Sequence, residues 1–194
     1  PVSITLGATG PQITASPGRI DPANPAFSVS RKPLAGEFVY AGKPLFVIAT
    51  HFTAKSSDDP LFGRIQPPSE PSEAKRAQQA AIIAGFVAQI RAVQRDAFVV
   101  VLGDFNAFQF SSPLATLTAQ GLVNLIDLLP EAERYIYVYD GNAQALDHVL
   151  ISSGLQARAV VRHDIVHVNA EFPPAQRSSD HDPKLVGLQI SAGP

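Results

Sequence analysis

The chain has 194 residues, 45% of them hydrophobic and 16% charged, which is the size and composition of one globular domain with its own core. Its net charge of −2 excludes a protein coated in basic residues, and the absence of cysteine excludes disulfide bonds and zinc–thiolate sites. No apolar run in the sequence reaches the roughly 18 residues that a membrane-spanning helix needs.

The first part of the chain is rich in turns. Residues 1–30 are a loop-rich lead-in, because glycine and proline repeatedly interrupt any periodic pattern, and only residues 2–6 resemble a strand. Residues 37–40 and 44–51 are strand candidates separated by a turn at residues 41–43, so they predict a β-hairpin.

A long amphipathic helix is predicted over residues 72–93, after a proline-rich loop, with Ser72 as its N-cap. Its apolar positions have the spacing i, i+3, i+4 and i+7 and form one stripe: Ile83, Phe86, Val87 and Ile90. Residues 97–102 follow as a nearly continuous β-branched run, which is typical of a strand buried on both faces.

The remaining elements are shorter. We expect a short helix over residues 113–118, an ambiguous element over 122–128, and strands over 146–152, within 157–168 and over 185–190. Buried strands that alternate with an amphipathic helix indicate an α/β layered sandwich.

Polar groups stand beside the ends of four predicted strands. They are His51, the Gly103-Asp104-Phe105-Asn106 segment, Asp147 and the Asp180-His181-Asp182-Pro183 segment. Each pattern alone is weak, since a lone histidine is more often structural and Gly-Asp-x-Asn is also a common turn. Strand ends hold side chains rigidly yet leave them open to solvent, so the four together predict one functional site.

Four motifs carry a resemblance to a known family, in this order: His51-Phe52-x-x-Lys55, Gly103-Asp104-Phe105-Asn106, Leu146-Asp147-His148 and Ser179-Asp180-His181-Asp182-Pro183. They resemble the motifs of the endonuclease/exonuclease/phosphatase superfamily. The segments around Arg31, Phe62 and Tyr137 are similar to a bacterial branch of large extracellular nuclease-like proteins, which implies secretion.

The resemblance implies a fold and a truncation. The fold is a four-layer α/β/β/α sandwich of the deoxyribonuclease type, with residues 1–194 as the carboxy-terminal portion of one domain. In this family the first strands supply an Asn and a Glu of the metal site, and nothing before Arg31 matches them. Together with the absence of methionine, this predicts an internal piece of a longer protein.

The resemblance also implies metal-dependent chemistry with Mg²⁺, or with Ca²⁺ or Mn²⁺. Asp104 and Asp180 would be metal ligands, and Asp104 would otherwise orient the attacking water. His181 would act as a general acid or base, with Asp147 holding its ring in the correct tautomer. His51 would contact the scissile phosphate.

Other residues would bind the substrate phosphate or support the loops of the site. The resemblance implies that Asn106 hydrogen-bonds the phosphate and that Arg31 and Lys55 bind phosphate as cations. Arg76 and Gln79 are predicted to support the loop after His51 rather than to touch substrate.

The predicted function is phosphodiester hydrolysis by an extracellular nuclease that acts on DNA or RNA. One alternative keeps the chemistry and changes the substrate to a phosphomonoester, a sphingomyelin-type lipid or an inositol phosphate. The other is a non-catalytic fragment or binding module that lacks the metal-site Glu. The sequence makes no prediction of oligomeric state.

Overall fold

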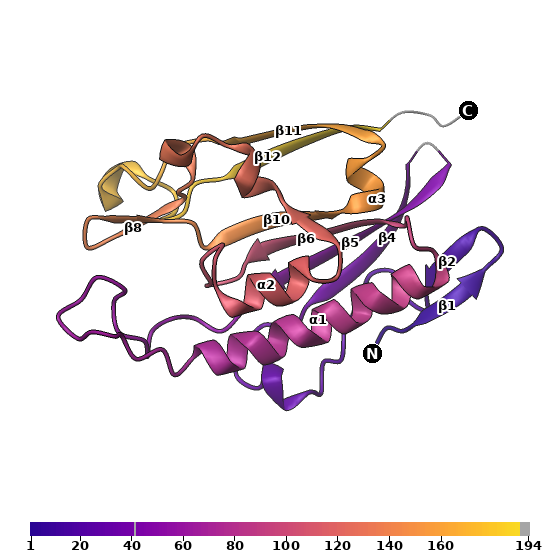
Figure 1. Ribbon diagram of the computed structural model, residues 1–194, viewed down its shortest axis with the longest axis horizontal. Coiled ribbons are helices and arrows are strands. Elements are labelled where there is room, and N and C mark those ends of the chain that lie inside the picture. Colours follow the sequence, from indigo (N-terminus) through magenta and orange to yellow (C-terminus); the bar gives the residue numbers. More distant parts are fainter. Residues whose placement is uncertain (41, 191–194) are drawn as a thin grey trace.

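The computed structural model describes residues 1–40 and 42–190, and its centre is one six-stranded sheet (Figure 1). The strand order is β3-β4-β5-β6-β10-β7. The strands are β3 (Gly18–Arg19), β4 (Leu34–Tyr40), β5 (Lys43–His51), β6 (Phe98–Asp104), β7 (Leu122–Asn124) and β10 (Asp147–Ser152).

The central strands have mixed directions. β4 and β5 pair antiparallel, which confirms the predicted hairpin, and Tyr40 pairs with Lys43. The predicted turn includes Ala41, which lies outside the described residues. β5 runs parallel to β6, and β10 runs antiparallel to β6, so the ends of β5 and β6 meet the start of β10 at one edge.

Two helices cover one face of this sheet: α1 (Glu73–Val93) and α2 (Ser112–Thr118). The predicted stripe on α1 is buried and packs against Val99 and Val101 of β6. Each such apolar side chain contributes about 1.5–3 kcal/mol on burial. The predicted cap is wrong, because the Ser72 side chain makes no capping hydrogen bond and instead contacts Asp58 and Arg76.

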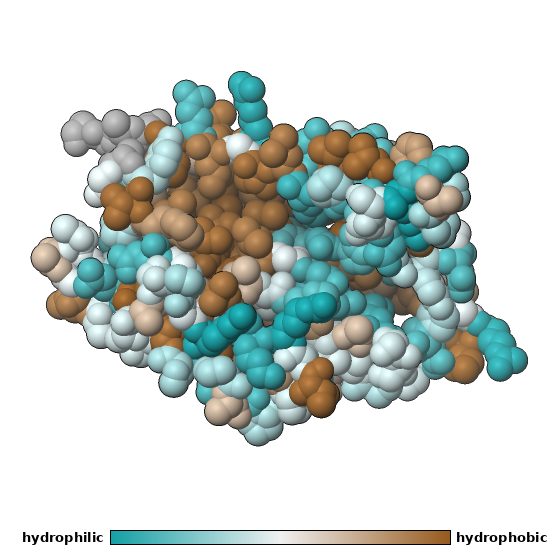
Figure 2. All heavy atoms as spheres, turned by 180° about the vertical axis from the view of Figure 1, so that it is seen from behind, coloured by the Kyte–Doolittle hydropathy of each residue, from teal (hydrophilic) through white to brown (hydrophobic). Residues whose placement is uncertain are grey.

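The opposite face carries a second, smaller sheet made of β11 (Ala159–Ile165) and β12 (Lys184–Ile190). Between the sheets lies a cluster that includes Phe98, Val100 and Ile151. Partly buried apolar side chains on β5, β6 and β12 flank this cluster, and Figure 2 shows apolar side chains gathered in a hollow on the side seen from behind.

Short elements complete the described part of the chain. Two hairpins are formed by β1 (Ile4–Gly7) with β2 (Gly10–Ile13) and by β8 (Tyr137–Tyr139) with β9 (Asn142–Gln144). The short helices are η1 (Pro25–Phe27), η2 (Leu125–Leu128), η3 (Glu131–Glu133), α3 (Ser153–Gln156) and η4 (Pro174–Gln176). No helix among the described residues has the length and apolar character to cross a membrane.

The predicted α/β class is therefore confirmed. The described residues form a helical layer, a six-stranded sheet and a two-stranded sheet, stacked in that order.

Candidate active site

Three predicted site residues form one row across the sheet. His51 on β5 is the register partner of Asp104 on β6, and Asp104 is the register partner of Asp147 on β10. Side chains alternate between the faces of a strand, and Phe98, Val100 and Leu102 of β6 belong to the cluster beneath β11 and β12. Asp104 continues that series, so the row lies on the face covered by the second sheet.

The backbone beneath the row is unusually close-packed at Gly103. This residue has a φ of 131°, and an added Cβ would lie 1.9 Å from the carbonyl oxygen of Thr50 on β5. Only glycine fits this conformation and this spacing. The close approach fixes the relative positions of His51 and Asp104, which are the next residues on the two strands.

Arg31 joins the His51 end of the row. Its Nη1 atom lies 2.9 Å from both ring nitrogens of His51, and the Nε2 atom of His51 lies 3.5 Å from Oδ2 of Asp104. The side chain of His51 is 37% exposed and that of Asp104 only 15%. The Arg31 guanidinium and the half-exposed His51 ring thus stand beside a more protected carboxylate.

His181 joins the other end of the row. Its Nδ1 atom lies 2.6 Å from Oδ2 of Asp147, and its ring packs on Tyr137 with a centroid separation of 4.9 Å. The hydrogen bond to Asp147 raises the pKa of His181 above its ordinary value and outweighs the opposing effect of burial. The contact leaves Nε2 of His181 as the nitrogen available for proton transfer.

The loop that carries Asp180 and His181 is anchored by Asp182. The Asp182 carboxylate is buried and accepts backbone N–H bonds from Val168, Asn169 and Ala170 at 2.7–3.1 Å. Burial alone would raise the pKa of Asp182, but these bonds and His167 hold it below its ordinary value. His167 lies 2.9 Å from Asp182 and helps to hold this loop in place.

Asn106 is a positioning residue for Asp104. It has a positive φ of 47°, which Asn tolerates better than most residues. Its backbone N–H donates to Asp104 at 2.7 Å, and its Nδ2 donates to the Phe52 carbonyl and to Asp104, both at 3.2 Å. The side-chain amide of Asn106, which was predicted to contact the phosphate, is therefore already hydrogen-bonded to the carboxylate of Asp104.

The two carboxylates of the row favour a cation. Burial and the neighbouring charge of Asp147 raise the pKa of Asp104 above its ordinary value. A hard divalent cation would relieve this repulsion, and Asp104 offers the oxygen ligands that Mg²⁺ prefers. Among the residues described, no three acidic or histidine side chains converge as a metal site. Mg²⁺ commonly binds one or two carboxylates and completes its shell with water and substrate phosphate, so Asp104 fits this mode.

The position of Asp180 is less central. It lies in the loop beside His181, where its charge contributes to raising the pKa of that imidazole. Its role as a metal ligand stays a prediction.

His148 supports the row from inside the core. Its Nδ1 accepts a hydrogen bond from Asn124 at 3.0 Å, and its Nε2 donates to the Ala107 carbonyl at 2.9 Å. Burial lowers the pKa of His148 to about 3, so the ring is neutral at ordinary pH. This histidine, part of the Leu146-Asp147-His148 motif, is structural.

Gln79 of α1 connects the two segments that carry Arg31 and His51. Its Oε1 accepts the Thr53 backbone N–H at 2.9 Å, and its Nε2 donates to the Ala26 carbonyl at 2.8 Å and to Ser30 at 2.9 Å. Gln79 is fully buried, so these contacts are shielded from water. The prediction that it supports the His51 loop is confirmed.

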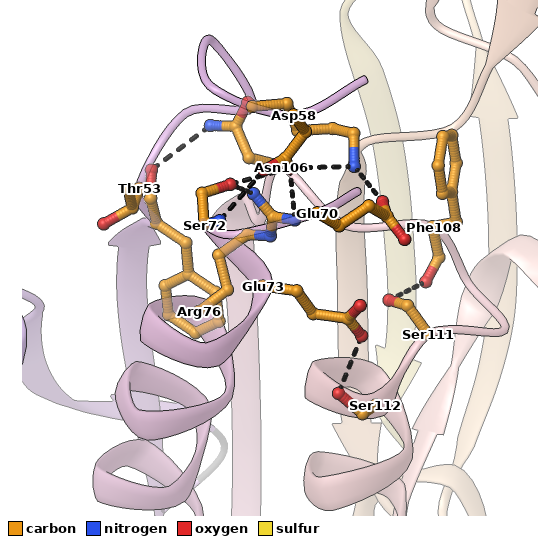
Figure 3. A network of polar contacts seen from close by, with 12 residues as sticks. Thr53, Asp58, Glu70, Ser72, Glu73, Arg76, Asn106, Phe108, Ser111 and Ser112 are labelled. Atoms are coloured by element: carbon orange, nitrogen blue, oxygen red, sulfur yellow. Dashed lines mark hydrogen bonds and ion pairs between the residues drawn. The ribbon is translucent and has the colours of Figure 1, made fainter. Parts of the chain in front are cut away.

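Arg76 supports the following loop through a buried ion pair (Figure 3). Its Nη2 lies 2.8 Å from Asp58, which also accepts hydrogen bonds from the backbone and hydroxyl of Ser72. Lys55 lies in the same network, 2.7 Å from Glu70. Lys55 is thus paired with a carboxylate, and it also lines the hollow that contains Asn106 and His181, so its phosphate contact stays a prediction.

Two hollows flank the site. One, of about 480 Å³, is lined by Arg31, His51 and Lys75 and is cationic. The other, of about 360 Å³, is lined by Asn106, His181 and aromatic residues. One hollow thus adjoins the His51 end of the row and the other adjoins His181.

The sequence did not predict the packing of Tyr137 on His181, the anchoring role of Asp182 or the ion partner Asp58. The alternation of Tyr135, Tyr137 and Tyr139 was the available signal for the first, since it indicated a strand near the site.

Solved structures share this fold at low sequence identity. A humanized D. rerio TDP2 superposes with a TM-score of 0.57 at 17% identity, over 82% of this chain and 61% of that one. A mannosyl-6-phosphatase of Bacteroides thetaiotaomicron gives a TM-score of 0.58 at 17% identity, over 82% of this chain and 57% of that one. The chain thus spans about three fifths of the length of these structures.

No curated protein sequence matches the chain. The family model described as "Endonuclease/Exonuclease/phosphatase family" matches residues 11–181, which include every candidate site residue. The chain belongs to the endonuclease/exonuclease/phosphatase family.

Proposed function

We propose that the protein is a divalent-metal-dependent phosphodiester hydrolase that cleaves nucleic acid, DNA or RNA, outside the cell. The single observation that carries the proposal is the row of His51, Asp104 and Asp147 on three adjacent strands, extended by the contact between His181 and Asp147. The extracellular location rests on the resemblance to bacterial extracellular nuclease-like proteins.

The residues divide the chemistry among them. A bound Mg²⁺ would neutralise phosphate charge and supply an activated water, and Asp104 would hold it. Arg31 and His51 bind the phosphate oxygens from one side. His181, whose ring Asp147 orients and whose pKa Asp147 raises, would donate the proton on Nε2 to the leaving oxygen. Asn106 keeps Asp104 in place during the reaction.

Nucleic acid is favoured because the site has room on both sides of the phosphate. The hollow lined by Arg31 and Lys75 offers positive charge for a neighbouring backbone phosphate, which a phosphomonoester lacks. A similar structure, that of D. rerio TDP2, is described as complexed with a single-strand DNA product, at 16% identity. Another similar structure, from B. thetaiotaomicron, is that of a mannosyl-6-phosphatase. A direct comparison of nucleic acid with a phosphomonoester as substrates therefore decides between the two classes.

The test is cleavage of supercoiled plasmid by the protein in Mg²⁺, with a phosphomonoester and sphingomyelin compared in parallel. Chelation of the metal should abolish cleavage, and His181→Ala should slow it about 10²–10⁴-fold. His163→Ala is the matched control, because His163 lies on β11 and contacts the Leu125 carbonyl outside the row. Undiminished cleavage of plasmid by His181→Ala contradicts the proposal. If the protein hydrolyses only sphingomyelin or only the phosphomonoester, that compound is the substrate and nucleic acid is not.

A further inference from the structure

The hollow beside His181 continues away from the row as a longer trough. It adjoins a second hollow of about 220 Å³, and the two share as lining residues Pro60, Leu61, Phe108, Tyr139 and Gln144. The trough begins at Asn106 and His181 and runs between the loop after β5 and the β8–β9 hairpin. We call this continuous surface the aromatic trough.

Aromatic side chains gather along the trough although the chain is only 8% aromatic. Tyr137 stacks on Tyr139 with a centroid separation of 6.3 Å, and Phe108 stacks on Phe110 with a separation of 5.3 Å. Phe62 is 77% exposed, Phe110 is 69% exposed and Tyr139 is 46% exposed. Exposed aromatic faces grouped beside a reaction centre mark a ligand surface rather than a core.

The polar groups of the trough include neutral amides as well as charged side chains. Gln109, Asn142 and Gln144 line it, and these side chains present both donors and acceptors. Lys55 contacts Glu70 and Arg134 contacts the Leu129 carbonyl. The carboxylates of Asp58 and Asp59 also line the trough and disfavour an anion there. The trough therefore suits a neutral, flat group with hydrogen-bonding edges, and it does not suit a second phosphate.

We propose that the aromatic trough binds unpaired nucleobases adjacent to the scissile phosphate, which makes single-stranded or locally unpaired nucleic acid the substrate class. This inference rests on the proposed function. Bases in a duplex are already stacked on each other, whereas unpaired bases stack on aromatic side chains. An acyl chain would fit the apolar walls but would leave the amides without partners, which disfavours lipid.

The test compares two short labelled oligonucleotides with the same number of phosphates, one of thymidines and one abasic, by fluorescence anisotropy in chelator. The base-containing strand should bind the protein about tenfold more tightly, because one stacked base supplies that factor. Tyr139→Ala should abolish the difference and Tyr139→Phe should keep it. Tyr40→Ala is the matched control, since Tyr40 is 49% exposed but lies on β4 away from the trough.

Equal binding of the two strands, or no binding of either, overturns the inference, as does an equal loss for both strands in Tyr139→Ala. The trough would instead be a lipid site if the protein sediments with sphingomyelin vesicles and the Phe62→Ser variant does not. Methyl p-nitrophenyl phosphate is a diester without a nucleobase, so its hydrolysis in Mg²⁺ measures the phosphodiesterase activity independently of the trough. If that diester is hydrolysed without any base preference, the trough inference fails and the proposed function stands. If the protein prefers the base-containing strand but does not hydrolyse the diester, the trough inference stands and the proposed hydrolase function fails.

Discussion

Nδ1 of His181 lies 2.6 Å from the carboxylate of Asp147, although the two residues are 34 positions apart in the chain. The contact joins the loop before β12 to the first residue of β10. It therefore connects the proton-transfer group to the rigid sheet that carries the other two members of the row.

Replacing the carboxylate with an amide tests this contact. Asp147→Asn keeps the size of the side chain but removes the charge that orients His181 and raises its pKa. We expect kcat to fall about 10²-fold while KM changes little, because the interaction acts on proton transfer and not on substrate binding. Steady-state kinetics on plasmid or oligonucleotide measures both constants. Asp164→Asn, an exposed residue on β11, is the control, and an unchanged kcat in Asp147→Asn would refute the assignment.

Gln79→Leu tests the link between the Arg31 and His51 segments. The substitution leaves the Thr53 N–H and the Ala26 carbonyl without their partner, so the free energy of unfolding should fall by about 1–3 kcal/mol. Activity should fall further than the loss of folded protein explains, because both segments reach the row. Urea denaturation and kinetics are the measurements. Gln78→Leu on the exposed face of the same helix should change neither, and equal effects of the two variants would show that Gln79 has no special role.

The buried His148 predicts a pH dependence of stability. Its pKa is about 3 in the folded state and 6.5 in the unfolded chain, so between these values only the unfolded chain binds the proton. The free energy of unfolding should therefore rise with pH through this interval and fall as the solution is acidified. Urea denaturation at several pH values measures it. His148→Gln should flatten the curve, whereas His51→Gln, at a half-exposed position, should keep its slope.

Gly103→Ala tests the close approach of β5 and β6. The added methyl group would overlap the Thr50 carbonyl and would also force an unfavourable φ, so we expect a loss of folded protein or of activity. Gly85→Ala is the matched control. Gly85 lies on α1 with open space around it, and alanine there should stabilise the helix by about 0.5–1 kcal/mol. Circular dichroism and thermal unfolding compare them. Equal stability of both variants would contradict the steric argument.

Much of the fold could be predicted because local pattern and packing agree. The stripe on α1 and the β-branched run of β6 are buried as predicted. Ser72 was predicted wrongly, since its hydroxyl is used by Asp58 and Arg76, and such a tertiary partner leaves no trace in a local pattern. β9 is only three residues long and is too short to be predicted from a local pattern, and it pairs with β8.

The site was predictable to a similar degree. Strand ends indicated His51, Asp104 and Asp147, and the register of β5, β6 and β10 brings them together. Lys55 shows the limit, because its partner Glu70 is 15 residues away across a loop whose path no spacing rule fixes.

The row of His51, Asp104 and Asp147 stands on three adjacent strands of the central sheet, whereas the aromatic walls beside it come from a loop and a short hairpin. Insertions or exchanges in those two connections would alter which molecules are accepted without disturbing the chemistry. Diversification of substrates within such a scaffold, by nature or by design, can therefore proceed one connection at a time.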